Sequence, residues 1–279
     1  MDKGFENNKC QLCGKDEQVG SHIIPKFIFK WLKKTGTGRL RKMENINIPI
    51  QDGIVKPFLC EECEGKFNKR ETYFANTFFY PVINNIEEIK YNGNLKYFIV
   101  SVFWRVLKDE LYKEVEKTIW YDTLLSVEKK WADYLLHDKP LNQFSNFHIL
   151  TGVNVLSNDN FIMYMSRMID AGIPNDENIC FFYVKLPRIV IVLPIGGINE
   201  SSFINTSIKQ NGTYYINNAI IKEEIIGDYL LFRSNLFLEE LNNKSDKQKK
   251  ATHDFISKRN IDIEKTDLGI IDNYIKNKK

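Results

Sequence analysis

The sequence has no long apolar run, so a membrane-spanning helix is not among its expected elements. Its most apolar stretch, residues 189–195, is too short to cross a bilayer and precedes a glycine pair, which favours a buried strand. The N-terminal residues also lack the apolar segment of a secretory signal, so we expect a cytoplasmic protein with no membrane contact. In that reducing compartment, paired cysteines favour metal binding over disulfides.

A large net charge is also absent, because 39 basic residues oppose 36 acidic ones and leave +3. No global field therefore draws the chain to nucleic acid or to an acidic membrane. Residues 26–42 differ, since they hold no acidic residue and seven basic ones: Lys26, Lys30, Lys33, Lys34, Arg39, Arg41 and Lys42. This basic run predicts either a solvated helix face or a surface that binds phosphates.

Cysteine is scarce, and four of the five cysteines form two Cys-x-x-Cys pairs. Cys10 and Cys13 make the first pair, and Cys60 and Cys63 make the second. Each turn presents two thiolates to one ion, and two such turns complete the tetrahedral shell that Zn²⁺ prefers. We therefore expect one structural zinc ion and not two disulfides. Cys180 stands alone in an apolar segment and is expected to pack in the core.

Hydrophobic residues make up 43% of the chain, which is typical of an ordered globular protein. Helical spacing of apolar residues predicts helices in the following ranges: 25–32, 61–79 with its end at Pro81, two within 95–137, and a last one at 218–242. Runs rich in β-branched and aromatic residues predict a small antiparallel sheet from these strands: 147–155, 161–169, 179–185 and 189–195. Residues 244–250 form a charged stretch with few apolar residues.

Between the cysteine pairs lies the motif Ser-His-Ile-Ile-Pro at residues 21–25, and Glu64 directly follows the second pair. This arrangement resembles the zinc-stabilised HNH endonucleases of the ββα-metal class. More narrowly, the motif, Gln-Asp-Gly at 51–53, Leu-Cys at 59–60 and Glu71 resemble a bacterial group of HNH-like proteins, some of them associated with antiviral defence. The resemblance covers roughly the first 80 residues and leaves the rest of the chain unassigned.

The resemblance implies a metal-dependent nuclease. His22 matches the histidine that deprotonates water in that class, and imidazole suits this role because its pKa lies near neutrality. A catalytic Mg²⁺ or Mn²⁺ would act beside it, while basic residues such as Lys26, Lys30 and Arg41 hold the phosphates. The sequence departs from the class at Ser21, where the class usually carries an acidic or histidine metal ligand.

Glu64 departs as well, because it replaces the histidine or asparagine that usually follows the last cysteine. If residues 60–79 are helical, Glu64, Asn68 and Glu71 share one helix face. They are then either oxygen ligands for Mg²⁺ or Mn²⁺ or part of a solvated surface. The other histidines have no such setting and are expected to be structural.

We thus expect an α+β chain with an N-terminal ββα-metal or treble-clef-like zinc module, a helical middle, and a small antiparallel sheet with helices on its C-terminal side. The predicted divisions are 1–80, 81–140 and 141–279, the last being a sensor, a partner surface or a dimer surface. The expected function is hydrolysis of DNA, or else RNA, in phage defence. The alternative is an inactive zinc-stabilised module that binds nucleic acid or protein. A second copy of the chain and a defence-system protein are the other partners considered.

Overall fold

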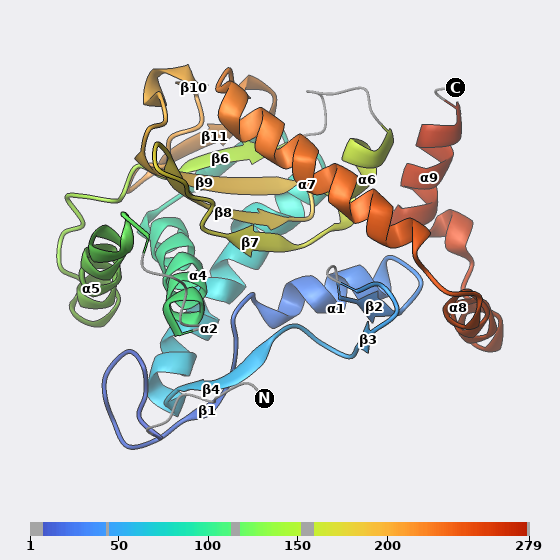
Figure 1. Cartoon of the computed structure of the whole chain (residues 1–279), viewed down its shortest axis with the longest axis horizontal. Coiled ribbons are helices and arrows are strands. Elements are labelled where there is room, and N and C mark those ends of the chain that lie inside the picture. Colours follow the sequence, from blue (N-terminus) through green and yellow to red (C-terminus); the bar gives the residue numbers. More distant parts are fainter. Residues whose placement is uncertain (1–7, 43–44, 113–117, 152–158, 278–279) are drawn as a thin grey trace.

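The computed structural model describes residues 8–42, 45–112, 118–151 and 159–277. In these residues the protein is α+β, as the sequence predicts, with an antiparallel sheet between helices and a small ββα unit to one side (Figure 1). None of the described helices is long and apolar enough to cross a bilayer.

The N-terminal unit is built on two antiparallel strands, β1 (Val19–His22) and β4 (Val55–Leu59), followed by helix α2 (Glu61–Phe74). Cys60 is the N-cap of α2, so the second cysteine pair opens this helix as expected. The link from β1 to β4 contains α1 (Lys26–Lys34), β2 (Leu40–Arg41) and β3 (Pro49–Ile50).

Helix α1 confirms the short helix that was predicted after Pro25. Pro25 is its N-cap, a place where the missing proline N–H is not needed. Ile28, Phe29 and Trp31 are buried on one side of α1, while Lys30 is exposed on the other. The helix therefore anchors the unit by its apolar face and presents lysines to solvent.

The prediction that Pro81 ends the second helix is wrong. After α2 the chain widens into a π-helical turn at Ala75–Phe79 and continues as α3 (Tyr80–Ile83). Pro81 lies in the first turn of α3, where its missing N–H removes little bonding, and the preceding wide turn makes room for its ring.

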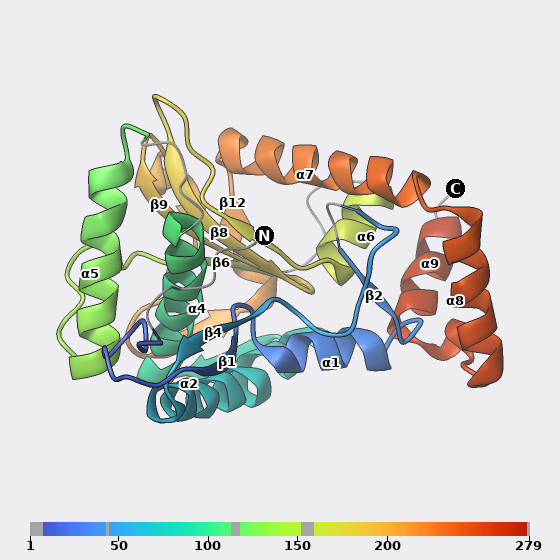
Figure 2. The ribbon, with the colours of Figure 1, turned by 60° about the horizontal axis from the view of Figure 1, so that its bottom comes forward.

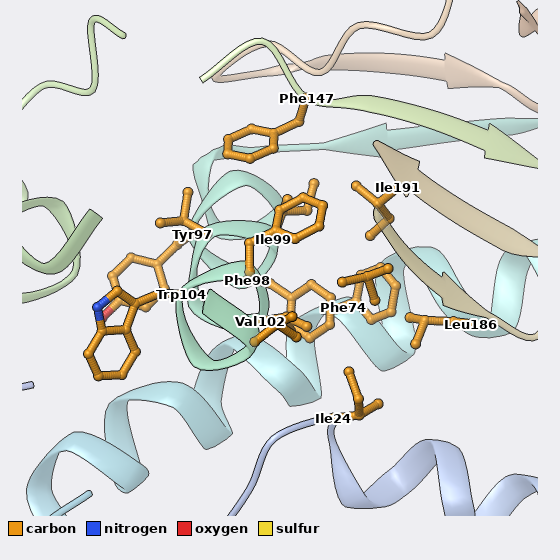
Figure 3. Packing of buried hydrophobic residues seen from close by; sticks show 14 of the residues in the cluster. Ile24, Phe74, Tyr97, Phe98, Ile99, Val102, Trp104, Phe147, Leu186 and Ile191 are labelled. Atoms are coloured by element: carbon orange, nitrogen blue, oxygen red, sulfur yellow. The ribbon is translucent and has the colours of Figure 1, made fainter. Parts of the chain in front are cut away.

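The two helices predicted within 95–137 are confirmed as α4 (Gly93–Tyr112) and α5 (Tyr121–His137). Helix α4 crosses α2, and the rings of Phe74 and Phe98 stack there with centroids 3.9 Å apart (Figure 3). Trp104 lies further along α4 and packs edge-on against Phe58, which joins α4 to the ββα unit.

The main sheet has the strand order β6-β9-β8-β7, and all neighbours are antiparallel. Its strands are β6 (His148–Thr151), β7 (Asp170–Gly172), β8 (Cys180–Leu186) and β9 (Ile189–Gly196). Successive β8 side chains alternate between two clusters, with Phe182 on the side of α4 and Phe181 on the side of α7. Helices thus cover both faces, which explains the nearly continuous apolar runs.

The strand predicted at 161–169 is wrong, because this segment forms helix α6 (Asp159–Arg167). Phe161, Tyr164 and Met165 are buried at helical spacing and pack with Leu230 of α7. Their aromatic and thioether side chains suit a buried helix face as well as a strand, so local composition favoured the wrong element.

The last predicted helix begins later than expected, as α7 (Glu224–Asn242), and two more follow it: α8 (Asp246–Lys258) and α9 (Asp267–Asn277). Ser245 caps α8 by accepting a hydrogen bond from the Gln248 N–H at 3.4 Å. Most of the charged stretch at 244–250 therefore belongs to helix α8, which begins at Asp246.

Four short strands form two further antiparallel pairs: β5 (Glu88–Tyr91) with β11 (Gly212–Tyr215), and β10 (Phe203–Ile204) with β12 (Ile220–Ile221). Short 3₁₀ turns occur at Glu200–Ser202, Ile216–Asn218 and Ile263–Lys265. One hydrophobic cluster includes Phe67, Trp104 and Phe182, which come from each of the three predicted segments. The divisions near residues 80 and 140 stay a prediction.

Candidate zinc site and adjoining polar cluster

The four paired cysteines meet in space, and their Sγ atoms all lie within 4.8 Å of one another. Cys10 and Cys13 come from the turn before β1, while Cys60 and Cys63 come from the start of α2. The Cys13 N–H donates to the Sγ of Cys10 at 3.5 Å, a contact typical of a zinc knuckle. Gly14 follows with φ of +76°, a conformation that glycine adopts without strain.

The sulfur geometry suits a tetrahedral ion and not a disulfide. The Sγ atoms of Cys13 and Cys60 are 3.6 Å apart, whereas a disulfide requires about 2.05 Å. Zn–S bonds of about 2.3 Å place tetrahedral sulfurs about 3.8 Å apart. A hydrogen bond from Cys63 lowers the pKa of Cys10 to about 4, so one thiolate forms readily. These residues could hold a structural metal ion such as zinc, as predicted.

Cys180 behaves as expected for a packing residue. It is fully buried on β8, and this burial raises the pKa of its thiol to about 12.

His22 lies at the end of β1, next to the loop that precedes β4. Its side chain is 13% exposed, and its Nε2 atom is 3.5 Å from Oδ2 of Asp52. The same Asp52 oxygen is 3.5 Å from Nζ of Lys26 at the start of α1. The Gly53 N–H donates to the other Asp52 oxygen at 3.1 Å. These contacts lower the pKa of Asp52 against the opposing effect of its burial, so the residue remains a carboxylate facing the imidazole.

Glu64 points from the first turn of α2 toward the same region. Burial raises the pKa of Glu64, while hydrogen bonding to Ser21 and the charges of Arg105 and His22 oppose that shift. Its Oε2 atom is buried and has no hydrogen-bond partner among the described residues. A buried carboxylate oxygen without a donor is costly, and a cation or an ordered water beside it would remove that cost.

Glu71, two turns further along α2, is engaged by a buried arginine. Arg105 of α4 has no exposed surface, and its guanidinium lies 2.9 Å from Oε1 of Glu71. It also donates to the carbonyl of His22 at 2.6 Å and to that of Ser101 at 3.2 Å. Arg105 therefore fixes the end of β1 and the middle of α2 to the same helix, and it supplies a positive charge at the carboxylates.

Asn68, the third residue of the predicted face, is exposed, while Glu71 is buried and Glu64 is partly buried. Among the described histidine, cysteine and carboxylate side chains, the four cysteines are the one group of three or more whose ligand atoms gather closely enough for a metal ion. His22, Glu64 and Glu71 do not form such a group by themselves. A catalytic Mg²⁺ or Mn²⁺ thus remains a proposal.

The predicted phosphate-binding residues divide into three sets: exposed lysines, one tethered lysine, and two arginines that contact α8. Lys26, Lys30 and Lys34 on α1, and Lys42 beyond β2, are exposed. Lys33 instead donates to the Gln51 carbonyl at 2.8 Å, which tethers the loop that carries Asp52.

Arg39 and Arg41 contact helix α8. The Arg41 guanidinium donates to Oε1 of Gln248 at 2.7 Å and to Oγ1 of Thr252 at 3.0 Å. The Arg39 guanidinium lies over the ring of Phe255 at 5.1 Å. Both arginines were predicted to hold phosphates, and here they also join the N-terminal unit to the C-terminal helices.

Two residues of this cluster, Asp52 and Arg105, were missed as site residues from the sequence. Asp52 belongs to the Gln-Asp-Gly motif that carries part of the resemblance, but no role was predicted for this aspartate. Arg105 lies inside an apolar helical pattern 83 residues after His22, and no local signal links it to the motif. The charge pair of Lys56 and Asp109 joins β4 to α4 nearby and was missed for the same reason.

No protein-family model, curated protein or solved structure matches this chain. The likeness to HNH endonucleases therefore rests on the sequence motifs of the first 80 or so residues.

Proposed function

We propose that the protein is a metal-dependent nuclease that hydrolyses phosphodiester bonds of DNA. The observation that carries this proposal is the arrangement of His22. Its imidazole faces the Asp52 carboxylate, and the cation-binding candidate Glu64 comes from the adjacent, cysteine-anchored helix. A histidine oriented by a carboxylate is suited to take a proton from water.

In this proposal the residues act in distinct roles. Asp52 faces Nε2 of His22 and favours the tautomer with its proton on that nitrogen, which leaves Nδ1 to accept the proton of the attacking water. Lys26, held next to Asp52 and 52% exposed, is placed to contact a phosphate oxygen. Arg105 keeps the His22 backbone in place. The cysteine-bound zinc holds the unit together and takes no part in the chemistry.

Glu64 is the better candidate to contact the catalytic ion. Glu71 is already neutralised by Arg105, whereas Oε2 of Glu64 lacks a partner among the described groups. Mg²⁺ commonly uses one or two protein carboxylates and takes its other ligands from water and substrate phosphate, so a site with few protein ligands fits it. When bound, the ion would stabilise charge on the scissile phosphate and leaving oxygen.

Two observations favour the alternative, a binding module without turnover. The Nε2 atom of His22 is buried with no hydrogen bond, and Ser21, at the position where the HNH class usually has a metal ligand, has no exposed surface. Such a module would bind nucleic acid through the lysines of α1 and leave it intact. A role in antiviral defence is supported by the resemblance alone.

The test is incubation of zinc-loaded protein with plasmid, single-stranded DNA and RNA, each with Mg²⁺ or Mn²⁺. The proposal expects cleavage of DNA that His22→Ala reduces by about 100-fold or more, the usual contribution of a general base. His137→Ala is the matched control, because His137 is exposed at the end of α5, and it should cut like the natural protein. Binding without cleavage in every reaction would overturn the proposal in favour of the alternative.

A further inference from the structure

Helix α8 carries several basic side chains that no sequence motif singled out. Residues 244–259 contain six lysines and arginines and two aspartates. Five of these basic residues are exposed and define the α8 basic surface: Lys247, Lys249, Lys250, Lys258 and Arg259.

Part of the predicted basic run is fixed against the inner side of α8. Arg41 binds Gln248 and Thr252 there, and Arg39 lies over the Phe255 ring. The 39–42 segment and α8 are therefore in contact, although about 200 residues separate them in sequence, and Lys42 adds an exposed charge to this region.

Few acidic groups balance these charges. Among the described residues, the ion pairs of α8 join Lys249 to Asp246 at 3.2 Å and His253 to Asp254 at 3.8 Å. Desolvation first, and then the charges of Arg41, Lys249 and Arg39, lower the pKa of Lys244. Cations that repel one another at a surface are stabilised when a polyanion binds.

The α8 basic surface continues a line of cations that begins at the candidate site. Helix α1 starts at Lys26, beside Asp52 and His22, and its nine residues extend about 13 Å. Lys30 and Lys34 are exposed along it. The far end of α1 lies near β2 and the C-terminal helices (Figure 2). Charged side chains thus lead from the site to α8.

We propose that the α8 basic surface binds the phosphate backbone of duplex DNA at a distance from the cutting site. The inference rests on the proposed nuclease function for the identity of its ligand. Duplex DNA carries one negative charge per about 1.7 Å of axis, so a 13-residue helix of about 20 Å can contact several phosphates.

The composition of α8 argues against a membrane as the polyanion. A helix that binds at a membrane interface exposes a face of large apolar residues. The large apolar residues of α8, Phe255 and Ile256, are partly buried, and Phe255 is covered by the guanidinium groups of Arg39 and Arg259. The outer positions of α8 carry charges.

The test is a binding titration with the full, zinc-loaded chain carrying His22→Ala, so that bound DNA stays intact. The triple change Lys247→Gln, Lys249→Gln and Lys250→Gln alters only exposed positions and keeps good helix formers. Two duplexes are compared, of about 8 and about 24 base pairs, because the shorter one, about 27 Å long, offers fewer phosphates to the site and to α8 at the same time.

The matched control changes three exposed lysines outside α8, which lie on β5, on α5 and just after α5: Lys90→Gln, Lys129→Gln and Lys139→Gln. Figure 2 shows α5 at the end of the molecule opposite α8. It removes the same amount of charge without touching α8.

The triple α8 variant should bind the longer duplex at least about tenfold more weakly, and the slope of log K against log salt should fall by up to about 0.9 per lost contact. It should lose less affinity for the shorter duplex, which cannot occupy as much of the site and α8 together. If the variant and its parent bind both duplexes with equal affinity, the α8 basic surface does not bind DNA and the inference is overturned. An equal loss of affinity for both duplexes contradicts binding at a distance from the cutting site. The same loss of affinity in the control variant shows that the effect is not specific to α8. Absence of binding by the parent overturns the proposed function and this inference with it.

Discussion

Replacing Arg105 by methionine tests whether the buried ion pair with Glu71 holds the candidate site together. The change keeps an unbranched side chain that is compatible with α4, but it removes the guanidinium that lies 2.9 Å from Oε1 of Glu71. The Glu71 carboxylate then remains in a residue that is only 9% exposed. Removal of one partner from a buried pair costs about 3–5 kcal/mol, because the other charge is left uncompensated.

A double-mutant cycle separates this effect from general damage. In Arg105→Met with Glu71→Met, no buried charge is stranded, although the His22 carbonyl still loses its donor at a cost of about 1–3 kcal/mol. The double variant should therefore be more stable than Arg105→Met alone. Urea unfolding of the zinc-loaded proteins measures each free energy.

Lys69→Met is the control, because Lys69 is exposed on the same helix as Glu71 and should change stability by no more than about 0.5 kcal/mol. For a chain of this length, the single Arg105 change should lower Tm by roughly 2 °C per kcal/mol, or about 6–10 °C. The reasoning would be refuted by an Arg105→Met protein as stable as the Lys69 control. A double variant whose loss equals the sum of the two single losses would also refute it.

Three further predictions concern zinc, pH and packing. Natural protein should contain one zinc ion per chain by mass spectrometry under native conditions, and Cys63→Ser should lose it and unfold at lower temperature. Burial lowers the pKa of His148 to about 4, with Glu200 opposing, so stability should fall between pH 6.5 and 4. That fall should be steeper than in His148→Gln by up to about 1.4 kcal/mol per pH unit. Gly53→Ala places Cβ 2.2 Å from Cε2 of Phe29 and should cost about 1–3 kcal/mol in thermal unfolding.

Each of these predictions has a result that contradicts it. Zinc retained at full stoichiometry in Cys63→Ser would argue against the four-cysteine shell. Identical pH dependence in natural protein and His148→Gln would mean that this histidine titrates normally. An unchanged melting temperature in Gly53→Ala would show that the Asp52 loop and α1 are less tightly packed than the structure has them.

The parts of the site that local sequence could predict are those that depend on spacing. Two Cys-x-x-Cys turns predict a shared ion because each turn fixes the distance between its own sulfurs. Helical periodicity likewise predicts one shared face of α2 for Glu64, Asn68 and Glu71, of which Glu64 is partly buried, Glu71 is buried and Asn68 is exposed.

The remaining parts depend on tertiary contacts that no local pattern encodes. Arg105 reaches His22 and Glu71 only because α4 crosses α2, and its apolar neighbours in sequence gave no sign of that role. Arg41 binds a helix about 200 residues away. The strand predicted at 161–169 is wrong because its large apolar side chains are compatible with a buried strand and with a buried helix face. Only the tertiary packing against α7 decides between them.

The central claim is that the cysteines hold a structural ion while His22 carries out the chemistry. The most direct test measures zinc content and the single-turnover rate of duplex cleavage on the same preparations of natural protein and His22→Ala. We predict one zinc per chain in both and a rate lower by about 100-fold or more in the variant. Undiminished cleavage by His22→Ala, or loss of zinc together with activity, would contradict that separation of roles.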